Sequence, residues 1–326
     1  MLYLRCRIKL ITPIQQMFLG IGAVKGQWWG TRCIQMGGYG WPDNPFMEYF
    51  TIATTGNATS FGSFTGGRRT ESAGMSGEGR FVFGCGETTN QPSLDIKSIQ
   101  YVTVATTSNA INFGTAIDGY ARTGVSNGII GVITGGPYSG SDVMEYITLA
   151  TTGNGTDFGD INLHAGAQGG MGSSGHDRAL MYGGYGNIGG WGTKDYINYI
   201  NPAVPGNTQD FGNLSLARYR ACGTGDETRG ICGGGEATPS NSGTNHVRID
   251  YVTMATTGNA TNFGNLTGIY RQGCGEGTNN TRALFSGGWS DQTTTDYITI
   301  QTTGNATDFG DLADGRYRNA SGSGDT

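Results

Sequence analysis

A 14-residue segment that recurs six times limits the possible folds of this chain more than any other feature. Each copy has a Tyr, a β-rich run, a Gly-Asn-like turn and a Phe-Gly pair, as in YVTMATTGNATNFG at 251–264. The tyrosines are Tyr49, Tyr101, Tyr146, Tyr199, Tyr251 and Tyr297, and the phenylalanines are Phe61, Phe113, Phe158, Phe211, Phe263 and Phe309. Tyr and Phe are always twelve positions apart, whereas successive Phe residues are 52, 45, 53, 52 and 46 apart. A rigid hairpin therefore alternates with loops of variable length.

The repeat predicts four strands in each unit. Thr-Gly-Asn lies between two β-rich runs, and we expect Gly and Asn to supply the positive φ of a tight hairpin turn. This hairpin gives the two outer strands. TRALFSGG at 281–288 exemplifies a third strand that ends in Gly-Gly, and YRACGTGD at 219–226 exemplifies a Gly-rich strand before it. Four strands in about 50 residues make a propeller blade, so the predicted fold class is all-β, a six-bladed β-propeller over residues 31–326.

The two ends of the predicted propeller complement each other. TRCIQMGG at 31–38 has no innermost strand before it, and RYRNASGSGDT at 316–326 is an innermost strand with nothing after it. We expect these segments to pair and close the ring, which removes two open sheet edges. Small residues lie eleven positions after each Phe, as expected where six strands converge on one axis: Ser72, Gly124, Gly169, Cys222, Cys274 and Ala320.

Two resemblances follow from these motifs. The order Gly-Gly, Tyr, aromatic, Leu and Arg resembles the kelch repeat over residues 31–326, with Phe where kelch units usually carry Trp. Kelch-like propellers serve as enzymes, adaptors and lectins, so this resemblance implies a fold and no single function. The near-verbatim ATTGNATxFG resembles kelch-like repeat proteins of marine bacteriophages, especially those of cyanobacteria. It implies a virion structural or tail-associated protein that is made in the host cytoplasm; a secreted or cell-surface location is the alternative.

Composition excludes some classes of partner and site. The net charge is −5 and the Lys and Arg residues are scattered, which argues against nucleic acid as a partner. The six Cys residues show no CxxC or metal-ligand spacing in this long chain, so we expect free thiols made in a reducing compartment. Cys222 and Cys274 are then small apolar fillers.

Residues 1–30 differ from the repeats and form a predicted N-terminal arm. Three basic residues precede a mildly apolar run, Leu10 to Val24, that is too short and too polar for a membrane span. A docking segment for other virion proteins, a signal-like leader and a plain N-terminal strap all fit this pattern.

No motif with specific chemistry stands out. His164, His176 and His246 lack metal-ligand spacing, and no GxSxG, HExxH or phosphate-binding loop is present. We therefore expect no catalytic residue, no bound metal and no cofactor. The alternative is a kelch-type carbohydrate-active enzyme, because propeller hydrolases assemble paired carboxylates from distant loops, or a secreted lectin.

The loops between the second and third strands of each unit carry the candidate ligand-binding residues. These loops vary in length, and variable loops on a rigid scaffold are where binding function usually lies. Their aromatic residues are Tyr39, Trp41, Tyr138, Tyr185, Trp191 and Trp289. The same face should receive Arg69, Arg122, Arg220, Arg271 and Arg318. The aromatics either stack on a ligand or pack loops onto blade ends, and the arginines either bind ligand or hydrogen-bond loop carbonyls. The predicted function is a non-enzymatic binding module that recognises host surface glycan or another virion protein.

Overall fold

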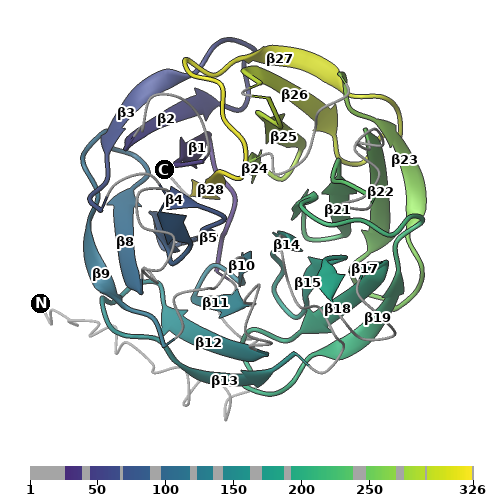
Figure 1. Cartoon of the computed structure of the whole chain (residues 1–326), viewed down its shortest axis with the longest axis horizontal. Coiled ribbons are helices and arrows are strands. Elements are labelled where there is room, and N and C mark those ends of the chain that lie inside the picture. The colour runs from purple at the N-terminus through teal and green to yellow at the C-terminus, as the bar shows by residue number, and fades with distance from the viewer. Residues whose placement is uncertain are drawn as a thin grey trace, which may run out of the picture.

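The fold is a closed ring of sheets. The computed structural model describes residues 26–38, 45–66, 69–88, 97–117, 123–134, 142–161, 171–186, 192–237, 247–268, 275–290 and 292–324. In these residues, six four-stranded antiparallel sheets stand around a central axis like the blades of a propeller (Figure 1). The six-bladed all-β fold predicted from the repeat is confirmed.

Each blade runs outward from an inner strand next to the axis. Blades 1 to 6 have the inner strands β28 (Ala320–Gly324), β5 (Ala73–Gly77), β10 (Thr123–Ser126), β14 (Met171–Ser173), β20 (Cys222–Gly225) and β24 (Gly275–Thr278). The second strands are β1 (Arg32–Met36), β6 (Arg80–Gly84), β11 (Ile130–Thr134), β15 (Ala179–Tyr182), β21 (Arg229–Gly233) and β25 (Arg282–Ser286). The third strands are β2 (Phe46–Thr51), β8 (Ser98–Thr103), β12 (Val143–Thr148), β18 (Tyr196–Ile200), β22 (Arg248–Thr253) and β26 (Thr294–Thr299). The outer strands are β3 (Thr59–Ser63), β9 (Ile111–Thr115), β13 (Thr156–Asp160), β19 (Gln209–Asn213), β23 (Thr261–Asn265) and β27 (Thr307–Asp311).

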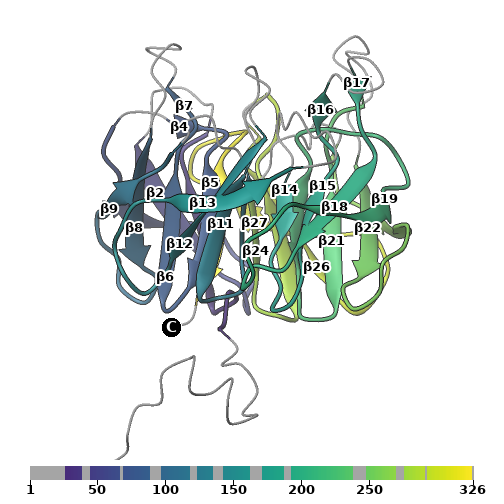
Figure 2. The ribbon, with the colours of Figure 1, turned by 90° about the horizontal axis from the view of Figure 1, so that it is seen from below.

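The ring has two different ends. One end, the loop face, carries the connections from second to third strands and two short ribbons, β4 (Arg69–Thr70) with β7 (Glu87–Thr88) and β16 (Tyr185–Gly186) with β17 (Gly192–Thr193), at the top of Figure 2. The other end, the turn face, carries the Thr-Gly-Asn turns and the end of β28. The predicted separation of variable loops from uniform turns is therefore correct.

The chain closes the ring as predicted. β28 pairs antiparallel with β1, from Arg32 opposite Gly324 to Met36 opposite Ala320. Blade 1 thus takes its inner strand from the end of the chain and its other three strands from the beginning. Because β1 has a partner on both sides, it presents no open edge.

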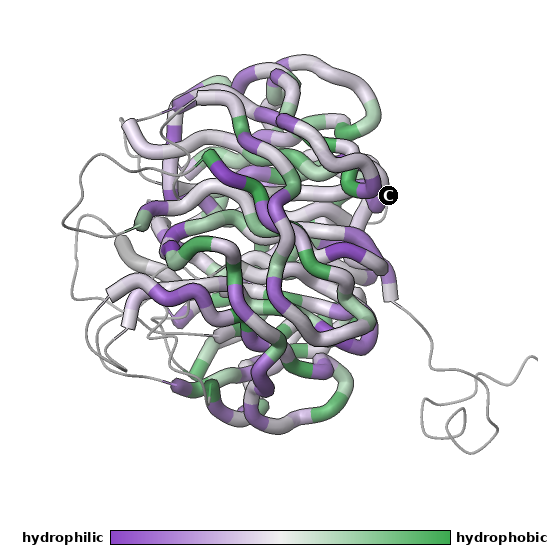
Figure 3. The backbone as a smooth tube through the Cα atoms, turned by 90° about the vertical axis from the view of Figure 1, so that its right-hand side faces the viewer, coloured by the Kyte–Doolittle hydropathy of each residue, from purple (hydrophilic) through white to green (hydrophobic). Residues whose placement is uncertain are grey.

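The hydrophobic core consists of six separate clusters, each between two neighbouring blades. One cluster joins Ile34, Met36 and Phe61 of blade 1 to Phe81 and Phe83 of blade 2. The other clusters join blades 2 to 3, 3 to 4, 4 to 5, 5 to 6 and 6 to 1. Figure 3 accordingly shows short hydrophobic stretches distributed through the whole body. Burial therefore stabilises contacts between blades, and a blade on its own would expose a large apolar face.

The repeated Tyr and Phe lie edge to face in every blade. The ring centroids are 5.9 Å apart for Tyr49 and Phe61, and the other five pairs lie at 5.8 to 6.2 Å. A bulge interrupts the register between the third and outer strands of each blade, for example at Met47 and Glu48. The constant twelve-residue spacing therefore preserves an aromatic pair together with its bulge.

The Thr-Gly-Asn turn joins each blade to the one before it. At the closing contact, the amides of Gly56 and Ala58 donate to the carbonyls of Phe309 and Asp311, and the Asn57 Oδ1 accepts from the Asp311 amide at 3.1 Å. An Asn residue accepts equivalent side-chain bonds at the other five junctions: Asn109, Asn154, Asn207, Asn259 and Asn305. The prediction that Gly and Asn supply positive φ in these turns is wrong, because none of these Asn residues has positive φ and Gly56, at 157°, is the one turn glycine that does. The motif is repeated because it forms the contact between blades.

The Phe-Gly glycine completes the same contact. A Cβ on Gly310 would overlap the carbonyl of Gly56 in the next blade, and a Cβ on Gly264 would overlap the carbonyl of Gly304. A Cβ on any of the other four Phe-Gly glycines would likewise overlap the turn of the next blade: Gly62, Gly114, Gly159 and Gly212. Only a residue without a side chain lets the outer strand approach the neighbouring turn this closely.

Small residues on the inner strands are also confirmed, although the position eleven residues after Phe does not always lie inside the inner strand. Ser72 lies just before β5, while Gly124, Cys222 and Ala320 lie in inner strands; Gly169 and Cys274 are outside the described residues. A Cβ on Gly124 would overlap the backbone of Gly74 in the adjacent blade. Crowding of backbones around the axis therefore explains the composition of these strands.

The prediction of free thiols is wrong for Cys222 and for the cysteine bonded to it. Cys222 is disulfide-bonded, and its partner is not among the described residues. Cys33, Cys85 and Cys232 are buried thiols outside any disulfide. Sequence spacing alone did not distinguish Cys222 from these three residues.

We predict that deleting residues 316–326 abolishes cooperative unfolding. The deletion removes β28 and exposes an edge of β1, so the truncated chain should aggregate or melt in a broad transition. Calorimetry with light scattering would measure this, and a synthetic peptide of residues 316–326 should restore the sharp transition. A truncated protein that melts like the full chain would contradict ring closure as the source of stability.

A pair of glycines that face each other gives a matched test of the junction between blades. Gly264→Ala places a methyl group against the Gly304 carbonyl and should lower the free energy of unfolding by about 1–3 kcal/mol. Gly304→Ala has nothing within 4 Å of the new methyl group and should change it by about 0.5 kcal/mol or less. Urea unfolding of both variants measures the difference, and equal losses would show that the close approach does not matter.

Candidate functional site

The candidate site lies at the mouth of the central channel on the loop face. Three side chains reach it from the connections that lead into inner strands: Glu71 before β5, Arg220 before β20 and Arg318 before β28. All three have left-handed backbone conformations, with φ of 56°, 54° and 57°. Residues that carry a side chain rarely adopt this backbone conformation. Those that do are often found at functional sites.

Glu71 joins two arginines that come from different parts of the ring. Its Oε1 lies 3.1 Å from Nη1 of Arg318 in the adjacent blade 1 and 3.4 Å from Nε of Arg220 in blade 5. Because blades 2 and 5 face each other in a six-membered ring, this ion cluster crosses the channel mouth. The Glu71 side chain is 4% exposed, compared with 14% for Arg220 and 18% for Arg318, so both guanidinium groups remain partly accessible.

An aromatic pair flanks each arginine. Arg220 lies 4.7 Å from the ring centroid of Tyr219, which packs against Tyr185 at 5.6 Å. Arg318 lies 5.4 Å from the ring centroid of Tyr317, which packs against Trp289 at 4.8 Å. The two units have the same design, because each outer aromatic directly follows the Gly-Gly pair of one blade and each Tyr-Arg pair leads into the next blade.

A second carboxylate lies next to the Tyr219 unit. Glu236 Oε2 is 3.7 Å from Nη1 of Arg220, and the backbones of Glu236 and Tyr219 form a two-way hydrogen-bonded bridge. Arg220 Nη1 also donates to the Tyr219 hydroxyl at 3.2 Å. Burial raises the pKa of Tyr219 to about 12, although the charge of Arg220 opposes this shift. The phenol is therefore neutral at physiological pH.

The groups at the mouth match the chemistry of a polar ligand with an apolar ring face. Two guanidinium groups donate hydrogen bonds, two carboxylates accept them, and the four charges cancel. A hydroxyl group both donates and accepts, so it can pair with either partner. Trp289 and the half-buried Tyr185 offer ring surface on which a sugar ring can stack, whereas Tyr219 and Tyr317 are buried beneath them.

Arg218 and Arg316 have a structural role. Each lies two residues before one of the site arginines, Arg220 and Arg318. Arg218 is fully buried and donates to Asp250 Oδ2 at 2.7 Å, and Arg316 contacts Glu48. Burial raises the pKa of Glu48, and the Arg316 charge opposes this shift. These ion pairs hold the connections on which Tyr219, Arg220, Tyr317 and Arg318 are placed. The repeated Arg-Tyr-Arg sequence thus combines a buried anchoring Arg, a buried Tyr and a partly accessible Arg.

The structure brings together four of the predicted site residues: Tyr185, Trp289, Arg220 and Arg318. Trp289 is 39% exposed and Tyr185 is half-buried. Arg69 lies in β4, where its backbone pairs with Thr88, and its side chain is outside the described part of the chain. The same is true of six whole residues: Tyr39, Trp41, Tyr138, Trp191, Arg122 and Arg271. For these seven residues the predicted role stays a prediction.

Sequence reasoning missed Glu71, Tyr219, Glu236 and Tyr317. A signal for the two tyrosines was present, since Arg-Tyr-Arg occurs at both 218–220 and 316–318. Glu71 has no such signal, because the connection into blade 2 contains a different sequence, and only the ring places it between two arginines.

The described residues contain no group of three or more His, Cys, Asp or Glu side chains arranged to hold a metal ion. Among the same residues, no helix is both long and apolar enough to cross a membrane. Of the three histidines, His176 is described; it lies on the turn face with Nε2 3.4 Å from Glu227 Oε1.

Comparisons with known proteins support the fold alone. No family model and no curated protein matches the sequence. The structure is similar to the solved structure of YjhT, with a TM-score of 0.66 and 14% sequence identity, over 87% of this chain and 95% of that one. At this identity the similarity shows a shared six-bladed propeller and carries no function to this chain.

The pKa of Tyr219 predicts how stability changes at alkaline pH. The phenol ionises near its ordinary value of about 10 in the unfolded chain and near 12 in the folded chain. The folded state therefore holds the proton longer, so this contribution to stability is complete below pH 10 and is lost as pH rises towards 12. Urea unfolding at about pH 9 and about pH 11 should show a larger loss for the parent than for Tyr219→Phe. Equal losses would show that Tyr219 is not shielded as described.

Proposed function

We propose that this chain is a non-enzymatic binding module of a virion or cell surface, and that the mouth on the loop face binds a hydroxyl-rich ligand such as a host surface glycan. One observation carries the proposal. Trp289, Tyr317, Arg318, Glu71, Arg220, Tyr219 and Tyr185 form a continuous series of contacts across the channel mouth. The partly exposed members of this series, Trp289 and Arg318 on one side and Arg220 and Tyr185 on the other, suit a ligand longer than one sugar ring.

The balance of groups favours a glycan over a strongly charged ligand. A basic patch would select phosphate or nucleic acid, whereas the arginines here are paired with carboxylates. Trp289 keeps 39% of its surface exposed although it packs on Tyr317, so one side of its ring is open for stacking. Trp and Arg are also the residue types that contribute most at protein interfaces, so another virion protein is the second candidate ligand.

The two ends of the ring suit a module that is attached at one end and binds at the other. Residues 26–30 approach the propeller at the turn face, while the candidate site lies on the loop face (Figure 2). An attachment through the N-terminal arm would leave the loop face directed away from the carrier. The virion as carrier rests on the resemblance of the ATTGNATxFG repeat to phage proteins.

We predict that Trp289→Ala weakens glycan binding roughly thirtyfold, because loss of a stacked aromatic at an interface centre costs about 2 kcal/mol. Arg318→Met should also weaken binding, since it keeps the aliphatic stem and removes the donors. A glycan array would identify the ligand, and calorimetric titration would measure the affinities.

A matched control comes from the opposite end of the ring. Val204 is 60% exposed in the turn that connects β18 and β19, so Val204→Ala should leave the affinity unchanged. Weaker binding by Val204→Ala together with unchanged binding by Trp289→Ala would place the site on the turn face instead. Release of shortened sugars from a bound glycan would indicate an enzyme.

A further inference from the structure

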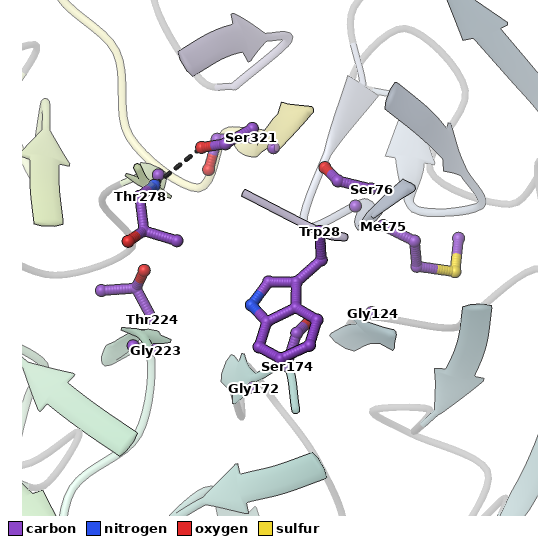
Figure 4. A pocket seen from close by; sticks show the side chains of 15 residues that line it. Trp28, Met75, Ser76, Gly124, Gly172, Ser174, Gly223, Thr224, Thr278 and Ser321 are labelled. Atoms are coloured by element: carbon purple, nitrogen blue, oxygen red, sulfur yellow. Dashed lines mark hydrogen bonds between the residues drawn. The ribbon is translucent and has the colours of Figure 1, made fainter. Parts of the chain in front are cut away.

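The central channel contains an aromatic side chain from outside the blades. Trp28 is 4% exposed and lies at the turn-face end of the channel, surrounded by inner strands (Figure 4). Apart from Met75, the residues that line this space are small or polar, among them Gly74, Gly124, Gly172 and Gly223. Once the indole is in place, a cavity of about 40 Å³ is left, which is room for a few water molecules at most.

The inner strands cannot fill this space themselves. Their backbones already touch around the axis, so glycine is required at positions such as Gly74 and Gly124, and larger side chains cannot project into the channel from them. The Ser and Thr side chains on the same strands are short. A flat ring inserted along the axis is therefore a way to fill the channel without pushing the blades apart.

The segment that carries Trp28 contacts four blades. Gly26 packs so closely on Gly128 of the turn leading into β11 that a Cβ would lie 2.5 Å from the Gly128 carbonyl carbon. The Gly30 amide donates to the carbonyl of Thr278 in blade 6 at 3.2 Å, and the chain then continues into β1 of blade 1. Blade 4 supplies the fourth contact, described next.

His176 forms the wall of this site in blade 4. Its ring lies 4.7 Å from the Trp28 ring and 6.1 Å from the Trp29 ring, in both cases edge to face. The two indoles also pack edge to face, at 4.7 Å. Trp29 is half-buried outside the channel, which makes it a matched control for Trp28.

We propose that the turn-face end of the channel is a binding site for an indole ring, and that Trp28 is its resident ligand, which fastens the N-terminal segment to the propeller. This role of Trp28 does not require that the loop face binds a ligand. The backbone on either side of Trp28 crosses the turn-face end of the channel, from Gly26 at blade 3 to Gly30 at blade 6. The site should therefore accept free indole when Trp28 is truncated.

The experiment uses the full chain with Trp28→Ala and Trp29→Ala. Trp28→Ala should lower the melting temperature by about 5 °C or more, and Trp29→Ala by clearly less. Added indole should raise the melting temperature of Trp28→Ala in a saturable manner and should not raise that of the parent or of Trp29→Ala. Trp28→Ala that melts within about 1 °C of the parent, or gains nothing specific from indole, would overturn the proposal.

Hydrogen exchange tests the fastening role in the same samples. The Gly30 amide should exchange faster in Trp28→Ala than in the parent, and indole should slow it again, while the Gly258 amide, bonded to Phe211 at a distant junction, stays unchanged. Exchange at Gly30 that does not respond to Trp28→Ala would refute this role. If Trp28→Ala does not fold, Trp28→Phe should fold with a melting temperature below that of the parent; a Phe variant as stable as the parent would overturn the proposal.

Discussion

The contact between each Thr-Gly-Asn turn and the outer strand of the preceding blade is the interaction on which the ring depends. It combines two backbone hydrogen bonds, one side-chain acceptor and a glycine that permits the approach, and it recurs between blades 6 and 1 with the same groups. The apolar clusters lie between the same pairs of blades. A blade can bury its faces only when both neighbours are in place, so the closing strand β28 contributes to the stability of every blade.

A second set of contacts reinforces this arrangement where the sequence allows it. Arg32 stacks on Tyr49 of its own blade and donates to the carbonyls of Val104 and Ala105 in the next. Arg80, Arg178, Arg229 and Arg282 do the same in their blades. Blade 3 has Ile130 at this place in its second strand, so its junction with blade 4 lacks that guanidinium.

The fold was predictable because the features that determine it are local and repeated. The fixed distance from Tyr to Phe, the Gly-Gly ends and the two incomplete terminal segments led directly to the blades and their closure. The physical role of Asn57 was not predictable, because its partner Asp311 lies 254 residues away and a turn position explained Asn equally well. The candidate site was predictable only in part. Loop aromatics such as Trp289 stand out in the sequence, whereas Glu71 does not, because its two arginine partners come from other blades and meet it only in the folded ring.

The closing pair also places the first and last described strands of the ring side by side, with Arg32 opposite Gly324 at the turn face. The turns at all six junctions place Asn at the same position and make the same kind of contact, although 107–109 is Thr-Ser-Asn and 205–207 is Pro-Gly-Asn. In the part of the chain that the structure describes, the turn at the junction between blades 6 and 1 therefore makes no kind of contact that the turns at the other junctions lack. A short linker from Gly324 to the segment before Arg32, with new ends opened in another connection between blades, would yield a circular permutant with the same contacts. The contacts between blades therefore do not determine at which blade the chain begins.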